Sequence, residues 1–290
     1  MVTGRLQDFI REPETLEHIE SPQNRLIMVI GGSDTGKTTF ISHLIDHLSR
    51  ETVVAVADLD MGQSHLGPPT TIGWGKIEGG FNSWSAIQVE DFYFTGTLSP
   101  IGNLVPSLVG AQLITKAASL SCKKVIIDTT GLISEPAGRV LKQYKIDLIA
   151  PDMVLAIERS GELSRILDCF KFQESPRIHR IPVPDGVRVK TPEMRTRYRT
   201  RQLKPFFEGA GLFEVSLKDT VVRFTREPFR LNQEELKNRI ISLRDERNRD
   251  IAVGIIERVF PDDGRILIRT SFKGDRRFTA ILIGMTKISL

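Results

Sequence analysis

Cysteine is scarce in this sequence, with only two among 290 residues. Cys122 and Cys169 are too few to build a disulfide framework, and their separation matches no metal-ligand spacing. Long apolar runs are also missing, since no stretch approaches the ~20 residues that a membrane span requires. Residues 1–20 carry charges throughout and lack the apolar core of an export signal. These absences predict a cytoplasmic protein without a membrane partner.

Histidine is sparse as well and forms no metal motif. Two of the five histidines, His43 and His47, lie one helical turn apart, but the acid that a zinc-protease motif requires is missing. We interpret both as helix-surface residues. The hydrophobic content of 40% and the charged content of 26% are ordinary for a soluble globular protein. The net charge of +4 is mild, so the position of the charges is more informative than their sum.

The strongest motif is the run Gly31–Thr38, which fits G-x-x-x-x-G-K-[ST], the phosphate-binding P-loop. An apolar run at 26–30 precedes it, as in a buried parallel strand, and apolar residues follow it at helical spacing. In this order the loop N–H groups and the helix N-terminus attract an anion. Lys37 adds a full charge for the outer phosphates, and the Thr38 hydroxyl can ligate Mg²⁺. We expect the nucleotide to contact Gly31, Gly32, Ser33, Asp34, Thr35, Gly36, Lys37, Thr38 and Thr39.

Strand-like runs alternate with helical patterns over residues 26–209. This alternation predicts an α/β fold with a parallel sheet covered by helices on both faces. We expect strands at 26–30, 52–58, 92–94, 124–128, 152–157 and 178–183, and helices at 103–120, 136–146 and 161–170. Residues 1–25 are predicted to be a short lead-in, and residues 62–80 a long irregular segment of the kind that is usually functional. Alternating runs at 213–217, 221–224, 266–270 and 278–283, with a hairpin-turn signal at 262–264, predict a small, mostly β domain over 210–290.

Two acids compete for the role of metal-positioning carboxylate and catalytic base. In a parallel sheet the ligand lies beyond the carboxyl ends of the strands, where the P-loop, Asp58, Asp60, residues 96–100 and residues 128–131 should converge. Asp60 follows the second strand, and Asp128 ends a strand in the pattern of a Mg²⁺-site acid. We favour Asp60 as the base because Gly62, Gln63 and the long irregular segment follow closely after it. Thr38, Asp60 and Asp128 are the expected metal ligands.

A basic cluster is the second strong signal. Seven cations lie between Arg188 and Lys204 (188, 190, 195, 197, 199, 201 and 204) against one acid, Glu193. On a helix, Arg195 and Arg199 would share one face, and Arg197 and Arg201 roughly the opposite face. One pair could hold a transferring phosphate and the other a nucleic-acid backbone. We therefore predict an arginine-rich helical lid over about 187–207.

These residues resemble the polynucleotide 5′-hydroxyl kinases, a family that includes the kinase subunit of the pre-mRNA cleavage complex and shorter prokaryotic relatives. The shared order is the P-loop, Asp58–Gln63, Thr97–Pro100 with Asn103, Asp128–Gly131, and the arginine-rich stretch that ends in Pro205–Gly209. The resemblance covers about residues 24–210. It implies a kinase that uses ATP or another NTP with Mg²⁺ to phosphorylate the 5′-hydroxyl end of RNA or DNA.

Carried over by position, the resemblance gives each motif a role. It implies that Lys37, Asp60, Arg195 and Arg199 are catalytic, with Asp60 activating the 5′-hydroxyl. The expected substrate contacts within these motifs are Gln63, Thr97, Ser99, Thr129, Thr130 and Gly131, and the helix-face argument adds Arg197 and Arg201. The tryptophan of the family's substrate clasp is replaced by Leu132, which cannot stack on a base as an indole does. Trp74 or Trp84 could substitute, although a packing role is favoured for both.

Two other functions fit the same motifs. The first is a non-catalytic ATP-binding scaffold of a nucleic-acid-processing complex, although the intact Lys37, Thr38, Asp60 and lid arginines argue against lost chemistry. The second is a P-loop NTPase switch. The sequence has no Asn-Lys-x-Asp motif for guanine, which disfavours a conventional GTPase.

Overall fold

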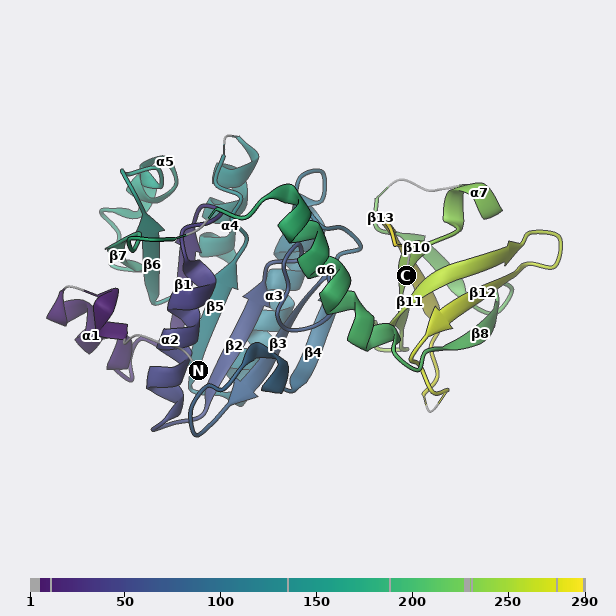
Figure 1. Cartoon of the computed structure of the whole chain (residues 1–290), viewed down its shortest axis with the longest axis horizontal. Coiled ribbons are helices and arrows are strands. Elements are labelled where there is room, and N and C mark those ends of the chain that lie inside the picture. The colour runs from purple at the N-terminus through teal and green to yellow at the C-terminus, as the bar shows by residue number, and fades with distance from the viewer. Residues whose placement is uncertain are drawn as a thin grey trace.

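The computed structural model describes residues 6–10, 12–134, 136–187, 189–226, 230, 232–274 and 276–288. It has two units, each built on one sheet (Figure 1). A seven-stranded sheet forms the first unit and a six-stranded sheet the second, and helix α6 (Pro192–Phe207) runs from the first to the second. None of the helices in the described ranges combines the length and the hydropathy of a membrane-spanning segment.

The seven-stranded sheet carries the P-loop at the end of its first strand. Its order is β4-β3-β2-β5-β1-β6-β7, and neighbouring strands are parallel except where β3 runs antiparallel to β2 and β4. The predicted α/β fold is confirmed. The strands are β1 (Leu26–Gly31), β2 (Val54–Leu59), β3 (Thr71–Ile77), β4 (Val89–Phe94), β5 (Lys124–Thr129), β6 (Met153–Glu158) and β7 (Arg177–Pro182).

One prediction about this sheet is wrong. Residues 62–80 are not irregular throughout, because β3 occupies Thr71–Ile77. Its glycines hide the strand signal, since glycine is depleted in strands. They are required by close backbone contacts: a Cβ on Gly73 would lie 2.7 Å from the Leu66 carbonyl oxygen, and one on Gly75 would lie 2.5 Å from the Gln88 carbonyl oxygen.

Helices cover both faces of this sheet because side chains alternate along each strand. On β1, Ile27 and Val29 pack with α1 (Pro13–Glu20) and α2 (Lys37–Ser49), whereas Met28 and Ile30 pack with α3 (Leu104–Ser121) and α4 (Ala137–Ile149).

The helix expected at 161–170 is shorter than predicted. It consists of α5 (Ser164–Leu167) and a 3-10 turn, η3 (Asp168–Phe170); two further 3-10 turns are η1 (Leu6–Asp8) and η2 (Trp84–Ala86).

The second unit is the predicted mostly β domain. Its order is β8-β12-β11-β10-β13-β9, antiparallel except for the pair β13 and β9. Its elements are β8 (Gly211–Ser216), β9 (Val221–Phe224), α7 (Gln233–Leu236), β10 (Arg239–Arg244), β11 (Asp250–Phe260), β12 (Arg265–Thr270) and β13 (Ala280–Lys287). The turn predicted at 262–264 connects β11 to β12, with Gly264 in a left-handed conformation (φ 61°). The sequence did not predict β10 and β11, whose pairings contain register shifts that break the alternation.

The two units are joined at the edge strand β4 and the turn after it. The backbone N–H of Phe94 donates to the Asp250 carboxylate of the second unit at 2.8 Å. Gly96 and Gly284 touch so closely that a Cβ on Gly284 would lie 2.7 Å from the Gly96 carbonyl oxygen. The second unit therefore fixes the backbone that leads into residues 97–100.

Candidate active site

The P-loop is a concave set of N–H groups around one cation. Asp34 and Gly36 adopt left-handed backbone conformations, with φ of 55° and 82°. Lys37 Nζ donates to the Gly32 carbonyl at 2.6 Å, so the ammonium lies inside the loop. Burial lowers the pKa of Lys37, while the nearby Asp128 opposes that shift. The loop and helix α2 together offer a polyphosphate both N–H donors and a charge.

Three acids stand at the ends of β2 and β5, next to the P-loop. Asp58 and Asp128 are register partners on these adjacent strands, and burial raises the pKa of each to about 7. Asp58 has a structural task, because its carboxylate accepts the backbone N–H groups of Asp60 at 3.0 Å, His65 at 2.5 Å and Leu66 at 3.2 Å. Asp58 thereby shapes the turn that presents Asp60, whose Oδ1 is in turn oriented by the N–H groups of residues 62 and 63.

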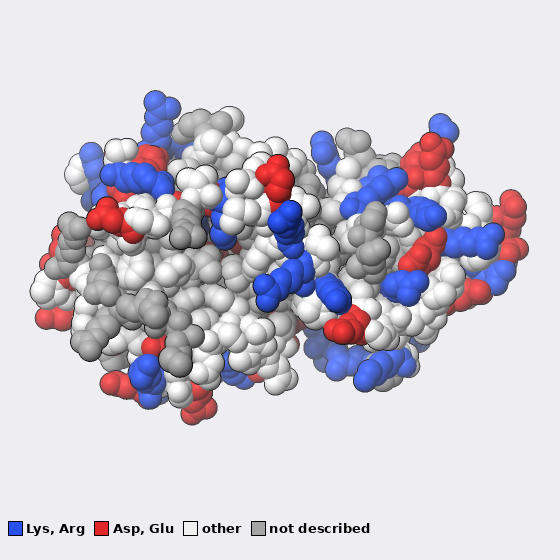
Figure 2. Space-filling model, in the orientation of Figure 1, with Lys and Arg blue, Asp and Glu red and all other residues white. Residues whose placement is uncertain are grey.

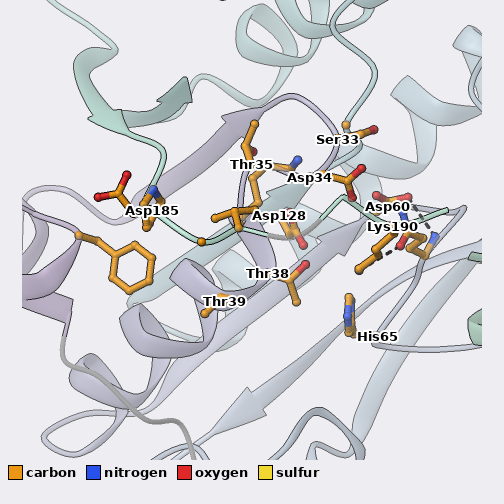
Figure 3. A pocket seen from close by; sticks show the side chains of 18 residues that line it. Ser33, Asp34, Thr35, Thr38, Thr39, Asp60, His65, Asp128, Asp185 and Lys190 are labelled. Atoms are coloured by element: carbon orange, nitrogen blue, oxygen red, sulfur yellow. Dashed lines mark hydrogen bonds between the residues drawn. The ribbon is translucent and has the colours of Figure 1, made fainter. Parts of the chain in front are cut away.

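The site is a cleft with two adjoining chambers at the carboxyl edge of the sheet. The first chamber has a volume of about 390 Å³ and is lined by P-loop residues 33–39, Asp60, Asp128 and residues 184–187 (Figure 3). The second has a volume of about 520 Å³ and is lined by Asp60, residues 98–100, residues 130–134 and two lid arginines. Five residues line both chambers: Ser33, Thr35, Asp60, Gln63 and Gly131. The convergence of four loops predicted from the sequence is therefore present.

Helix α6 covers the cleft, as a lid would. Thr191 caps its N-terminus by accepting the Met194 N–H at 3.3 Å. Arg195 pairs with Asp34 of the P-loop at 2.6 Å, and Lys190 donates to the Gln63 side chain at 3.3 Å. Residues 195 and 199 face the second chamber, whereas residues 197 and 201 line a separate hollow on the outer face of the helix. The predicted division of the arginines between two helix faces agrees with this arrangement, and Arg188 lies outside the described residues.

Most of the predicted site residues lie in the cleft, but five do not. Gly31, Thr97 and Thr129 line neither chamber, and Arg197 and Arg201 lie on the outer face of the lid. Thr129 is fully buried, with its hydroxyl donating to the Val29 carbonyl at 2.8 Å. Because Asp128 faces α2 and the cleft, the alternation along β5 turns Thr129 to the other face of the sheet.

Neither tryptophan reaches the second chamber. Trp74 is 4% exposed and belongs to the core beneath α3. Trp84 packs on the α2 side, where its indole N–H donates to the Ser42 hydroxyl at 3.1 Å. The packing interpretation therefore fits both, and Leu132 itself lines the second chamber.

Two cleft residues, Arg159 and His65, are not among the residues predicted from the sequence. Arg159 follows the carboxyl end of β6, lines the second chamber and donates to the Asp34 carbonyl at 2.7 Å. The same strand-end rule that drew attention to Asp60 would have found it. His65 lines the first chamber and packs between the tilted rings of Trp84 and Tyr198, at centroid distances of 4.7 and 5.6 Å. Burial lowers the pKa of His65, which favours its neutral form.

The residues at the base of the first chamber suit Mg²⁺. The Thr38 side chain and the Asp60 and Asp128 carboxyls line the same space (Figure 3), and Asp128 Oδ1 is buried without a hydrogen-bond partner in the described part of the chain. Within those same ranges, no three His, Cys, Asp or Glu residues gather into a self-sufficient metal site. This is the expected pattern for Mg²⁺, which takes one or two carboxylates and completes its shell with water and substrate phosphates.

Comparison with known proteins places this cleft in a family. Residues 31–209 match the family described as the mRNA cleavage and polyadenylation factor CLP1 P-loop. The chain belongs to the CLP1 P-loop family. The match begins at the P-loop and ends just after the lid, so all the residues that line the two chambers, apart from Phe9, lie inside it.

Curated relatives of this CLP1-family chain include archaeal kinases. It is 33% identical over 215 residues to a polyribonucleotide 5′-hydroxyl-kinase of Methanocaldococcus jannaschii, covering 73% of this chain and 59% of the relative. It is also 33% identical over 216 residues to a kinase of the same name from Pyrococcus furiosus, covering 74% and 60%. The matches thus span about 60% of the length of these relatives.

The fold has solved counterparts in the same family. A structure of the wild-type Clp1p–Pcf11p complex matches with a TM-score of 0.75, covering 94% of this chain and 77% of that chain at 14% identity. A second structure, described by an extended Pcf11p–Clp1p interface, matches with a TM-score of 0.74. At this identity the likeness establishes the fold, and it extends through the C-terminal unit because nearly the whole chain is covered.

Proposed function

We propose that this protein is a polyribonucleotide 5′-hydroxyl kinase that transfers the γ-phosphate of ATP or another NTP to the 5′-hydroxyl end of RNA. The observation that carries the proposal is the pair of chambers that share Asp60, one built on the P-loop and one on the lid arginines. Phosphoryl transfer needs a held nucleotide, a second space for the acceptor and a carboxylate between them. The names of the archaeal relatives point to the same reaction.

Each part of the site has a separate role in this proposed reaction. The nucleotide would occupy the first chamber, with its phosphates in the P-loop and beside Lys37. The acceptor 5′-oxygen would attack the γ-phosphorus from the second chamber, and the bond to the β,γ-bridging oxygen would break as the nucleoside diphosphate leaves. Asp60 would accept the proton of the 5′-hydroxyl, because its carboxylate lines both chambers. Mg²⁺, held through Thr38 and Asp128 when bound, would neutralise phosphate charge.

The lid supplies the remaining positive charge. Arg195 and Arg199 line the second chamber next to Ser33 of the P-loop, where charge on the transferring phosphoryl group would develop. The lid also covers the cleft through contacts to residues 34, 63 and 64. A covered cleft excludes water, which would otherwise compete with the 5′-hydroxyl as the nucleophile.

Labelled γ-phosphate provides the test. Wild-type protein with Mg²⁺ and γ-labelled ATP or GTP should label a 5′-hydroxyl RNA and leave the same RNA with a 5′-phosphate unlabelled. Lys37→Ala and Asp60→Asn should lose transfer by about a hundredfold or more. A 5′-hydroxyl DNA of the same sequence reports acceptor choice. Hydrolysis that RNA does not affect would instead support an NTPase switch, and tight binding without turnover would support a scaffold.

A further inference from the structure

The outer face of the lid carries cations that the proposed reaction does not use. Arg197, Arg201 and Lys204 line a hollow of about 680 Å³ on this face, and all three are exposed. No ion pair holds any of them within the described part of the chain. Figure 2 shows Lys and Arg side chains crossing this face of the molecule over α6 and reaching the depression between the two units.

A second hollow continues the first onto the C-terminal unit. It has a volume of about 580 Å³ and shares Phe207 with the lid hollow. Lys237, Asn238 and Arg269 line it, together with Glu257, which Arg269 neutralises at 2.6 Å. Across both hollows the lining contains five cations (197, 201, 204, 237 and 269) and two acids (208 and 257). The excess positive charge suits a polyanion.

The lid hollow also adjoins the second chamber. Arg199, which lines that chamber, donates to the Thr196 hydroxyl at 2.9 Å, and Thr196 lines the lid hollow. From Arg195 to Phe207 the helix covers about 18 Å. A single strand whose 5′ end lies in the second chamber can therefore pass from Arg199 over Thr196 into the lid hollow and then past Phe207.

We propose that the outer face of α6 and the adjoining face of the C-terminal unit form a track for the RNA backbone downstream of the 5′ end. The proposal rests on the proposed function, since it takes the acceptor strand from the second chamber. The cations of the track are expected to contact phosphates, which fix the position of a strand without reading its sequence. It gives the C-terminal unit a role in holding acceptors that extend beyond the first few nucleotides.

The test uses two lysines that lie outside the cleft. The double variant Lys204→Gln/Lys237→Gln removes one cation from each hollow. The control, Lys116→Gln/Lys123→Gln, removes two exposed lysines on and just after α3, which covers the opposite face of the first sheet. Acceptors are a 5′-hydroxyl dinucleotide and a 5′-hydroxyl RNA of about 12 nucleotides. KM is measured for each acceptor, and binding of the longer RNA is measured by fluorescence anisotropy at several salt concentrations.

For the longer RNA, KM should rise about tenfold in the track variant and stay within about twofold in the control, because two phosphate contacts are lost. The KM of the dinucleotide should move less than about twofold in both. The slope of log K against log salt should become shallower by about 1.4 in the track variant alone. Equal changes for both acceptors, or equal changes in both double variants, would overturn the track.

Failure of the proposed function has a different signature. If the wild type labels no acceptor of either length, the kinase proposal falls. The track is then judged on binding alone: a salt slope that differs between the two double variants supports it, and identical slopes overturn it.

Discussion

Lys145 is a buried charge without a hydrogen-bond partner in the described residues, and we expect it to lower the free energy of unfolding of this protein. Its side chain on α4 is 0% exposed, and its Nζ has no hydrogen-bond partner in the described residues. Burial lowers the pKa of Lys145 from 10.5 to about 8, even though Asp60 and Asp128 oppose the shift. Lys145→Met keeps a long, unbranched side chain and removes the charge, so we expect the variant to be more stable than the wild type at pH 7.

The magnitude follows from proton linkage. Lowering the pKa of Lys145 from 10.5 to about 8 corresponds to about 3 kcal/mol. The free energy of unfolding of the wild type is smaller by this amount well below pH 8, because Lys145 is then charged in both the folded and the unfolded state. Between pH 8 and 10.5 the folded state releases its proton first, so the wild type gains stability and the difference shrinks. The advantage of the variant should therefore be about 3 kcal/mol at pH 7 and near zero at pH 10.5.

Denaturant unfolding at pH 7, 8.5 and 10 measures the difference in free energy of unfolding between Lys145→Met and the wild type. Thermal unfolding at pH 7 provides a second measurement, in which the midpoint of Lys145→Met should lie about 5–10 °C above that of the wild type. The control is Lys116→Met on the neighbouring helix α3, whose exposed side chain should change stability by less than about 0.5 kcal/mol. A loss of stability in Lys145→Met at pH 7, or a gain that does not vary with pH, would refute the reasoning and indicate that the ammonium is solvated or partnered.

Three further predictions concern the cleft and its supports. The pKa of Asp128 is raised from 3.8 to about 7, so its contribution to stability is present below pH 4 and is lost as the pH rises toward 7. The melting temperatures of the wild type and Asp128→Asn should therefore agree at low pH and differ near neutrality. Over the same pH interval the affinity of the wild type for Mg²⁺–nucleotide should rise. Arg195→Ala should lower kcat by about a thousandfold in a single-turnover assay with little change in nucleotide Kd, and an equal loss in both would contradict a role at the transition state. Gly284→Ala should raise the KM of the RNA acceptor while nucleotide Kd stays constant, since the added methyl presses on Gly96 and shifts the turn at 97–100; a weaker nucleotide Kd would instead indicate general unfolding.

The parts of the site that the sequence predicted are those fixed by local chemistry. The P-loop, the strand before it and the helix after it occupy consecutive residues, and the acids at 60 and 128 follow from where strands end. Side-chain direction also followed from the sequence but was not used: Asp128 and Thr129 are adjacent on β5 and must face opposite sides. Applying that alternation would have removed Thr129 from the substrate contacts.

The remaining features depend on contacts between distant segments. The strand β3 contains Gly73 and Gly75, which disfavour a strand locally and are required only because other backbone segments pass close to them. The pairing of Arg195 with Asp34 joins residues 161 positions apart, so no local pattern indicates it. The track likewise requires the C-terminal unit to stand beside the lid, which the sequence left open.

The two ends of the lid are held by contacts of different strength, and this determines which end can open. At the N-terminal end the Arg195–Asp34 pair is partly exposed, with 30% of the arginine side chain accessible, and such a pair contributes about 1 kcal/mol at most. At the C-terminal end Leu203 and Phe207 are buried with Phe94 and Leu282, one from each unit, and burial of each large apolar side chain contributes about 1.5–3 kcal/mol. The lid should therefore pivot about residues 203–207 and release residues 190–199 first. Because that pivot is anchored to both units, Lys204 and the cations of the C-terminal unit would keep their position while Arg195, Arg197 and Arg199 move, so a bound RNA would stay on the C-terminal part of the track as the nucleotide exchanges.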